Sequence, residues 1–412
     1  MKKFNVPVIY RSPLITAIKN RRKFDDNLKK DFTPSFLNFG EVHIYLARHF
    51  GFCYGVENAI EISFKTIEEN PDKKIYLLSE MIHNPHVNID LKSRGVEFLM
   101  DTHGNTLIPF ERLNPGDIVV VPAFGTTLEM ERKLLKAGVE IEQYNTTCPF
   151  VEKVWNRAQA IAKNNYTVIV HGKPQHEETR ATFSHSAAHS PTVIVRDMKE
   201  AIKLSGYILG TNGPENFYTQ FAGQYSEGFK IENDLQRIGV VNQTTMLASE
   251  TQAIAEFLKA TMKDKYNLSE ANIAERFADT RDTLCYATND NQGAVYALLD
   301  TPAHLALVIG GYNSSNTSHL VELCENKLPT YFIRSEEEII SSIEISHYKI
   351  HTKEEVITLS YLPDKKPLKI LITSGASCPD ALVEGVIKKI ASFYNCSRTI
   401  DDIIKEYTNI PE

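Results

Sequence analysis

The stretch HFGFCYGVENAI, residues 49–60, places a cysteine between two segments of different periodicity. The apolar run at residues 42–47 is typical of a strand, whereas the three- and four-residue spacing of apolar residues after Cys53 predicts a helix. A thiol at the start of a helix lies near outward-pointing N–H groups, which lower its pKa. Cys53 is therefore a candidate metal ligand or nucleophile. The alternative is a small buried residue in a tight turn, since cysteine is among the most buried residue types.

Two more cysteines stand in the same kind of position. Cys148 follows the apolar residues 139–144 and directly precedes Pro149, a residue favoured at the first position of a helix. Cys285 lies within residues 278–288, which lead into another helix-like segment. Three thiolates at equivalent strand-to-helix junctions suit zinc or an iron–sulfur cluster, and three protein ligands leave one metal position open for catalysis.

The other three cysteines differ from these. Cys324 lies inside a helix-like run and Cys396 near a polar tail, so both are interpreted as structural. Cys378 begins another predicted helix, and its spacing leaves it unassigned. The absence of a C-x-x-C motif argues against a zinc ribbon or knuckle. Six scattered cysteines in 412 residues indicate a reducing compartment rather than a disulfide scaffold.

The composition is that of an ordinary soluble protein of two or three domains. The chain has 412 residues, of which 42% are hydrophobic and 24% charged. Its net charge of −7 argues against a nucleic-acid-binding protein, although it allows local basic pockets. No apolar run approaches the roughly 20 residues that span a bilayer, and the N-terminus lacks the apolar core of a secretory signal. We therefore expect a cytoplasmic protein without a nucleic-acid or membrane partner.

Short apolar runs alternate with amphipathic segments from residue 42 onward. Strands are predicted at residues 74–78, 117–122, 166–170, 192–195, 237–241, 305–309 and 368–372. Helices are predicted at residues 126–137, 149–163, 249–263, 315–327 and 379–393. This alternation predicts an α/β fold with largely parallel sheets. Residues 1–40 are basic and weakly periodic, so they are predicted to form a partly ordered extension with a solvated charged face.

Polar stretches follow five of the predicted strands, at the carboxyl ends where parallel sheets bind ligands. They contain His83, His176, residues 243–245 (QTT), residues 310–317 (GGYNSSNT) and residues 373–379 (TSGASCP). Ser, Asn and Gly at the start of a helix donate hydrogen bonds to phosphate, which predicts an anion site. For each Ser or Asn the alternative is a helix N-cap, and for either histidine a structural role.

Glu178 is the carboxylate that the sequence singles out as a proton donor. It lies in the same turn as His176, where a buried or donor-poor setting would raise its pKa. The neighbouring Glu177 points elsewhere on a helix and is interpreted as a first-turn charge that complements the helix dipole.

These motifs together resemble the LytB/IspH family, the 4-hydroxy-3-methylbut-2-enyl diphosphate reductases of the non-mevalonate isoprenoid pathway, over about residues 42–393. The ordered set is GFCxGV at Cys53, HN at His83, TCP at Cys148, HxE at His176, QTT at Gln243, DTxCxAT at Cys285, NSSN at Asn313 and GASxP at Gly375. Segments such as PAFG at residues 122–125 resemble the cyanobacterial and plant branch. Many bacterial members have a substrate-contacting histidine where this chain has Phe124, and the plant-like branch shares that replacement.

The resemblance implies three α/β domains in a pseudo-threefold arrangement around a central iron–sulfur cluster. The implied segments are an N-terminal extension at 1–40, one domain from 41–53 and 286–398, and two more at 54–147 and 148–285. Cys53, Cys148 and Cys285 would hold a [4Fe–4S] cluster and leave one iron open to substrate.

The reaction implied by the resemblance is a two-electron, two-proton reductive dehydroxylation to isopentenyl and dimethylallyl diphosphate. Glu178 would supply protons, relayed through Thr244. The diphosphate would be bound by His83, His176, Asn313, Ser314, Ser315, Asn316 and Ser377. Ferredoxin or flavodoxin is the implied electron donor, because the chain has no G-x-G-x-x-G fingerprint for a nicotinamide or flavin cofactor. The oligomeric state would be monomer or homodimer.

Two alternatives stay open at this point. One is a non-catalytic phosphate-ligand binding protein whose cysteines are structural or bind zinc. The other is a cluster-bearing dehydratase, which would need no external electrons.

Overall fold

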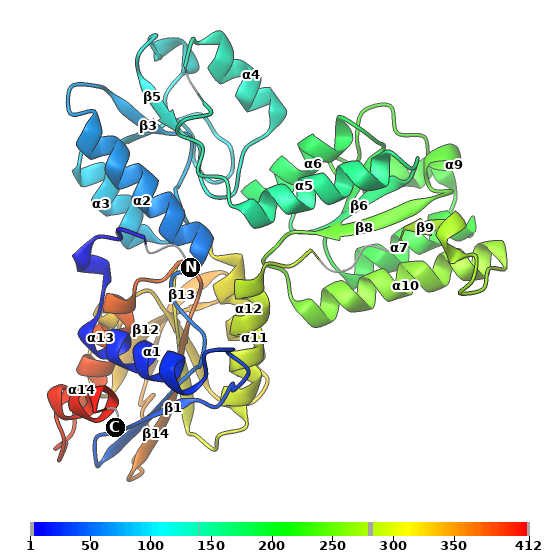
Figure 1. The fold of residues 1–412 in the computed structure, drawn as a ribbon. Coiled ribbons are helices and arrows are strands. Elements are labelled where there is room, and N and C mark those ends of the chain that lie inside the picture. Colours follow the sequence, from blue (N-terminus) through cyan, green and yellow to red (C-terminus); the bar gives the residue numbers. More distant parts are fainter. Residues whose placement is uncertain (1–3, 140, 279–282, 410–412) are drawn as a thin grey trace. The chain divides into compact units, whose positions relative to one another are not determined.

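The computed structural model describes residues 4–139, 141–278 and 283–409, which form two compact units (Figure 1). The first unit comprises residues 1–57, 83–87 and 286–412, and the second comprises 58–82 and 88–285. The two ends of the chain therefore belong to one unit. Among the described residues, no helix combines the length and the apolar character needed to cross a bilayer.

The first unit is built on a seven-stranded sheet. Its spatial order is β1 (Ser35–Asn38), β2 (Val42–Leu46), β14 (Leu368–Ser374), β10 (Leu305–Ile309), β11 (Thr330–Ile333), β12 (Glu344–Lys349) and β13 (Glu354–Leu359). The four strands from β2 to β11 are parallel, and the edge strands pair antiparallel. Both β10 and most of β14 are buried, which explains their almost continuous apolar sequences.

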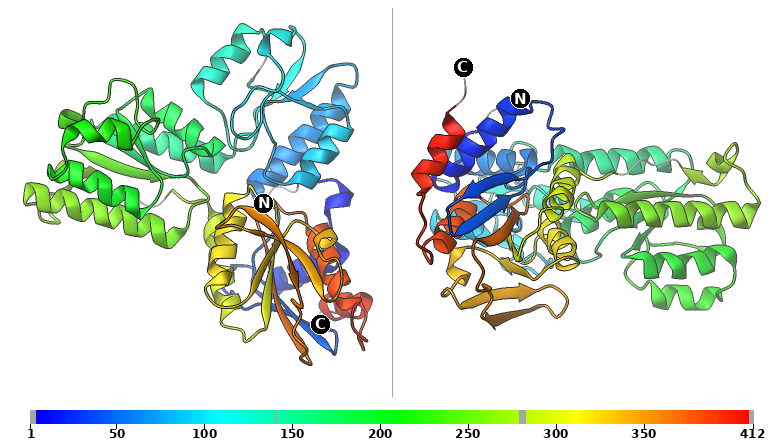
Figure 2. Two further views of the ribbon diagram at one scale, coloured as in Figure 1. Left: turned by 180° about the vertical axis from the view of Figure 1, so that it is seen from behind. Right: turned by 90° about the horizontal axis from the view of Figure 1, so that it is seen from below.

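Helices cover both faces of this sheet (Figures 1 and 2). One face carries α1 (Pro13–Asp25), α13 (Asp380–Ala391) and α14 (Ile400–Thr408), and the other carries α11 (Tyr286–Leu299) and α12 (Ser315–Glu325). The short helices η1 (Val8–Tyr10) and η5 (Glu336–Glu338) complete the unit, and α2 (Tyr54–Glu69) begins in it.

The N-terminal extension is more ordered than its sequence predicts. Helix α1 buries Leu14, Ile15 and Ile18 on one face, and Ser12 caps it by accepting a hydrogen bond from the backbone of Ile15 at 2.8 Å. Strand β1 then pairs with β2 along its whole length. The apolar face of α1 is short and surrounded by charges, so the periodicity that reveals a helix is weak.

The second unit contains two separate parallel sheets. The first sheet has the order β4 (Glu97–Phe98), β3 (Ile75–Leu77), β5 (Ile118–Val120), and the second has the order β7 (Thr192–Val195), β6 (Thr167–His171), β8 (Ile238–Asn242), β9 (Phe277–Ala278). Its helices are α3 (Pro85–Ser93, which begins in the first unit), η2 (Phe110–Arg112), α4 (Leu128–Lys136), α5 (Pro149–Ala162), α6 (Glu177–Ala187), α7 (Met198–Leu209), η3 (Pro214–Asn216), α8 (Phe217–Gln220), α9 (Ile231–Asp234), α10 (Ala248–Tyr266) and η4 (Ile273–Glu275).

The predicted α/β alternation is confirmed. Every predicted strand and helix is present, and the strand ends lie within two residues of their predicted positions. Of the apolar runs that precede the candidate cysteines, the one before Cys148, at residues 139–144, differs from the prediction. Its described residues form no strand. The described residues from this run to Cys148 make only one β-bridge, between Asn145 and Val121, which directly follows β5. Cys148 therefore follows a loop rather than a strand.

Candidate active site

The second unit brings Cys148 and Cys285 into electrostatic contact. Cys148 is the N-cap residue of α5, and its backbone N–H donates to the carbonyl of Ala123 at 2.9 Å. Cys285 immediately precedes α11, and its N–H donates to the carbonyl of Thr244 at 3.2 Å. The backbone therefore fixes both residues at helix starts, as predicted.

The expectation of a lowered thiol pKa is wrong for Cys148. Burial raises the pKa of Cys148 to about 11, and the nearby Cys285 and Glu178 act in the same direction. Hydrogen bonds from the backbone of Phe150 and Val151 lower the pKa but do not outweigh burial. The thiol keeps its proton at neutral pH unless a metal ion displaces it, which is how metal binding to cysteine generally proceeds.

Thr244 connects Cys285 to Glu178. The Thr244 backbone N–H donates to one Glu178 carboxylate oxygen at 2.5 Å, and its hydroxyl donates to the other at 2.9 Å. Glu178 is only 1% exposed and Thr244 4%. The carboxylate is buried, but its setting is not donor-poor, because Thr244 supplies two hydrogen bonds. The predicted acid and its predicted relay are thus in direct contact.

His176 and Phe124 lie beside this acid. His176 is the N-cap residue of α6, where its Nδ1 accepts a hydrogen bond from the backbone N–H of Glu178 at 3.2 Å. The ring of Phe124 meets the His176 ring edge-on, with centroids 5.6 Å apart. Phe124, which stands where many bacterial members have a histidine, cannot donate a hydrogen bond, but its ring packs against that of His176.

A buried pair that the sequence reasoning missed holds Thr283, two residues before Cys285. The Asn242 side-chain oxygen accepts hydrogen bonds from the Thr283 N–H at 3.0 Å and hydroxyl at 2.8 Å, and the Asn242 N–H donates back to that hydroxyl at 2.9 Å. The two residues are 2% and 8% exposed. Their place in the sequence could have indicated a role, because Asn242 directly precedes the QTT motif and Thr283 lies within the motif that contains Cys285.

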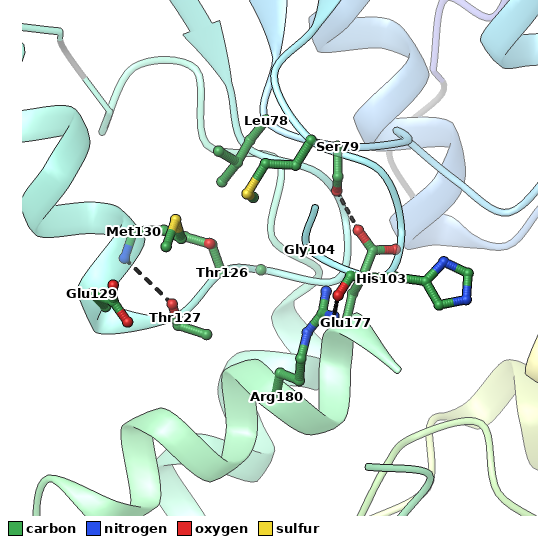
Figure 3. A pocket seen from close by; sticks show the side chains of 12 residues that line it. Leu78, Ser79, His103, Gly104, Thr126, Thr127, Glu129, Met130, Glu177 and Arg180 are labelled. Carbon is green, nitrogen blue, oxygen red and sulfur yellow. Dashed lines mark hydrogen bonds between the residues drawn. The ribbon is translucent and has the colours of Figure 1, made fainter. Parts of the chain in front are cut away.

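Glu177 is not a simple surface charge. It is 7% exposed, and its carboxylate accepts a hydrogen bond from the Ser79 hydroxyl. Both residues line a pocket of about 240 Å³, in which their side chains point toward each other (Figure 3). From the same pocket wall, Arg180 donates to the carbonyls of Thr102, at 3.1 Å, and His103. These contacts hold the first turn of α6, which carries Glu178.

In the first unit, three loops meet around the predicted diphosphate ligands. Ser314 is the N-cap residue of α12, as the N-cap alternative predicts. The Asn316 side-chain oxygen accepts from the backbone N–H of Ala376 at 3.0 Å, and the Ser377 hydroxyl donates to the His83 carbonyl at 3.1 Å. His83, Ser314, Ser315, Asn316 and Ser377 are all buried, whereas Asn313 is exposed.

These loops contain buried donors without a hydrogen-bond partner among the described residues. They are Ser315 Oγ, Asn316 Nδ2 and Asn84 Nδ2. A buried polar group left unsatisfied costs about 1–3 kcal/mol, so a ligand oxygen is the expected partner. Hydroxyl and amide donors suit phosphate oxygens. Asn84 was not among the predicted ligands, although it adjoins His83, which was.

Two glycines allow the loops to approach one another. A Cβ at Gly311 would collide with the backbone carbonyl of His83, and one at Gly375 with the Thr317 hydroxyl. Neither position accepts a larger residue without moving the loops that carry the candidate phosphate ligands.

Of the other cysteines, Cys53 is partly exposed at a helix start, whereas Cys324 and Cys378 are buried. Cys53 directly precedes α2 in the first unit, is partly exposed, and donates its N–H to the carbonyl of Ala376 at 3.2 Å. Cys324 lies inside α12 and Cys378 at a helix start, and both are fully buried. Burial raises the pKa of Cys324 to about 12 and also raises that of Cys378. Within the described part of the chain, no group of three or more His, Cys, Asp or Glu side chains surrounds one point.

Known proteins match this chain over most of its length. The LytB protein family matches residues 44–391. A 4-hydroxy-3-methylbut-2-enyl diphosphate reductase from Picosynechococcus sp. is 40% identical, over 92% of this chain and 89% of the relative. A relative of the same name from Prochlorococcus marinus subsp. pastoris is 38% identical, over 92% of this chain and 90% of the relative.

Two solved structures share the fold. The E-1-hydroxy-2-methyl-but-2-enyl-4-diphosphate reductase from Plasmodium falciparum matches with a TM-score of 0.60 and 22% identity, covering 84% of this chain and 86% of that one. A structure of (E)-4-hydroxy-3-methyl-but-2-enyl diphosphate reductase, the terminal enzyme of the non-mevalonate pathway, matches with a TM-score of 0.50 and 22% identity, covering 85% and 99%. The family match across residues 44–391 and relatives about 40% identical establish that this chain belongs to the LytB protein family.

Proposed function

We propose that this chain is a 4-hydroxy-3-methylbut-2-enyl diphosphate reductase, the activity for which its curated relatives are named. The observation that carries the proposal is the run of contacts from Cys285 through Thr244 to Glu178, beside Cys148. It joins a buried carboxylate, which can donate protons, to two thiols, which can bind metal. The alternative of a non-catalytic phosphate-binding protein is not favoured, because relatives across most of the chain are named as enzymes.

Cys53, Cys148 and Cys285 would hold a [4Fe–4S] cluster and would leave one iron open to substrate. The fit rests on the donor set. Cys148 and Cys285 lie together at helix starts, and Cys148 is a buried thiol that ionises only with a cation beside it. When bound, such a cluster supplies two electrons and a Lewis-acidic iron for the substrate's hydroxyl oxygen.

Glu178 would hold the proton that converts the departing hydroxyl to water, and Thr244 would pass it on through its own hydroxyl. His176, capping the same turn, would contact the diphosphate. The other groups that would bind it are those of His83, Asn313, Ser314, Ser315, Asn316 and Ser377. Of these groups, the buried Ser315 Oγ and Asn316 Nδ2 have no hydrogen-bond partner among the described residues, and their bonds to the diphosphate would help to orient the carbon chain.

The proposal extends to domains and partners. We assign one domain to residues 41–53 and 286–398 and the others to 54–147 and 148–285, with 1–40 as an extension. Ferredoxin or flavodoxin would donate electrons, and the protein would act in the cytoplasm as a monomer or homodimer. Six cysteines that carry thiols rather than disulfides support a reducing compartment.

The test is turnover by anaerobically purified protein, with the hydroxylated diphosphate as substrate and reduced methyl viologen as electron source. We expect isopentenyl and dimethylallyl diphosphate, with two viologen radicals oxidised for each product molecule. Conversion that proceeds without reductant would identify a dehydratase. Binding of the diphosphate without conversion would support the phosphate-binding alternative.

A further inference from the structure

A pocket of about 420 Å³ in the first unit has Cys53 in its wall. Its other walls come from α1 and the segment after it, the loop before α2, and the first residues of α11. The cationic side chains that line it are Lys19, Lys23, Lys29 and Arg48, and the carboxylates are Glu57 and Asp290. Four positive and two negative groups give this pocket a positive charge on a chain whose net charge is −7.

Part of this positive charge is available to a partner. Lys19 is paired with Asp380 at 2.8 Å, and the Arg48 guanidinium lies 4.0 Å from Asp26. Lys23 and the adjacent Lys30, by contrast, are exposed and have no ion pair among the described residues. Lys29 is exposed as well, with its ammonium 6.0 Å from the centre of the Tyr286 ring and in electrostatic interaction with Asp290. A free acidic group that reaches the pocket therefore meets lysines whose charge is at most partly compensated.

His49, which lines the pocket, is affected by the same positive charges. Burial, together with the smaller effects of the charges of Arg48, Lys29 and Arg22, lowers the pKa of His49 to about 4 against the opposing effect of Asp26. The charges of Arg48 and Lys29 thus act on a side chain that lines the pocket.

Large apolar side chains are exposed among these lysines. Leu28, between Asn27 and Lys29, is 73% exposed, Phe24 is 64% exposed, and Tyr286 in the pocket wall is 37% exposed. Apolar side chains interspersed with lysines suit a protein surface better than a small anion, which would require buried donors.

We propose that this lysine surface, made of Lys23, Lys29, Lys30, Leu28 and the rim of the Cys53 pocket, docks a small acidic protein that carries one electron at a time. The proposal rests on the proposed function, because that reaction requires electrons from outside the chain. Weak electron-transfer complexes bury little area and depend on complementary charge for fast encounter. The pocket brings the docked carrier next to Cys53, a proposed cluster ligand.

Each catalytic cycle needs two such encounters. Two reduced carriers each give up one electron, and the carbon–oxygen bond of the substrate hydroxyl breaks. One proton leaves with the hydroxyl as water, and a second forms a new carbon–hydrogen bond on the allylic fragment. The products are the dehydroxylated diphosphate and two oxidised carriers. A carrier that binds and leaves quickly suits this sequence, and charge steering provides fast association without tight binding.

The test uses the full-length cluster-loaded protein and a plant-type [2Fe–2S] ferredoxin as the acidic probe. The K23E/K29E/K30E variant is compared with K199E/K203E/K230E, which reverses three exposed lysines in the second unit. Turnover is measured against ferredoxin concentration and with reduced methyl viologen. We expect the first variant to raise the KM for ferredoxin by about tenfold or more and to weaken its salt dependence. Its viologen turnover, and both activities of the second variant, should stay at the unmodified level.

An unchanged KM for ferredoxin in K23E/K29E/K30E, or an equal rise in both variants, would overturn the docking surface. A titration of oxidised ferredoxin into each protein checks the result independently of turnover and must show weaker binding in K23E/K29E/K30E alone. If unmodified protein turns over with viologen while the ferredoxin KM ignores all six lysines, the proposed function stands and only the docking surface fails. Absence of viologen turnover in unmodified protein would reject the proposed function itself.

Discussion

Thr244 is the residue on which the chemistry of the second unit depends. Its N–H and hydroxyl donate to both oxygens of Glu178, and its carbonyl accepts from Cys285. One residue therefore sets the position of a proposed proton donor relative to a proposed metal ligand. The motif QTT predicted the presence of Thr244 at the site, but not that all three of its backbone and hydroxyl groups are used.

At the same scale, Glu178→Gln should abolish proton supply while keeping the shape of the side chain. We expect kcat to fall by about 100-fold or more, because general acid catalysis contributes roughly 10²–10⁴-fold, and substrate affinity to change little. The measurement is steady-state turnover with reduced viologen, together with direct binding of the diphosphate.

Glu177→Gln is the matched control for this substitution. Its amide oxygen can still accept the hydrogen bond from Ser79, so turnover should stay near the unmodified value. Normal turnover in Glu178→Gln, or equal losses in both variants, would remove the assignment of Glu178 as the proton donor.

Helix α6 shows how an element positions the site. Its first turn is held from one side by His176 as N-cap, and from the pocket of Figure 3 by Ser79, through Glu177, and by Arg180. The sequence indicated a helix here, with Glu177 as a charge in its first turn. It could not show that Glu177 is buried, because its partner Ser79 lies far away in the chain.

Arg180→Ala should loosen this end of α6. The variant loses hydrogen bonds from the guanidinium to the carbonyls of Thr102 and His103, and because Arg180 is partly exposed these contribute less than buried charge-assisted bonds, so the free energy of unfolding should fall by about 2 kcal/mol. Urea unfolding measures this loss. The exposed Arg112 provides the comparison, and Arg112→Ala should cost less than about 0.5 kcal/mol. Equal stability of the two variants would show that the Arg180 contacts do not hold the helix.

At the scale of the whole molecule, the sequence predicted the α/β elements well for a physical reason. Strands such as Leu305–Ile309 are buried on both faces, so their apolar character is almost continuous and easily recognised. The N-terminal extension was underestimated, because only a few residues of α1 are buried and lysines and arginines surround them. Pairings between distant residues, such as Asn242 with Thr283, carry no local signal.

For the cysteines, too, features set by the local sequence could be predicted, and features set by distant residues could not. Helix starts at Cys53, Cys148 and Cys285 could be predicted from local pattern, and all three are confirmed. The raised pKa of Cys148 could not be predicted from the local pattern, because it depends on burial by residues elsewhere in the unit. The family assignment from the ordered motifs is also confirmed.

The central proposal is that Cys53, Cys148 and Cys285 hold one iron–sulfur cluster. The most direct measurement is the iron and sulfide content of anaerobically purified protein and of four Cys→Ser variants. We predict about four irons per chain in unmodified protein and in Cys324→Ser, whose thiol is buried inside α12, and loss of most iron in Cys53→Ser, Cys148→Ser and Cys285→Ser. Zinc in place of iron, or an equal loss of iron in Cys324→Ser, would contradict it.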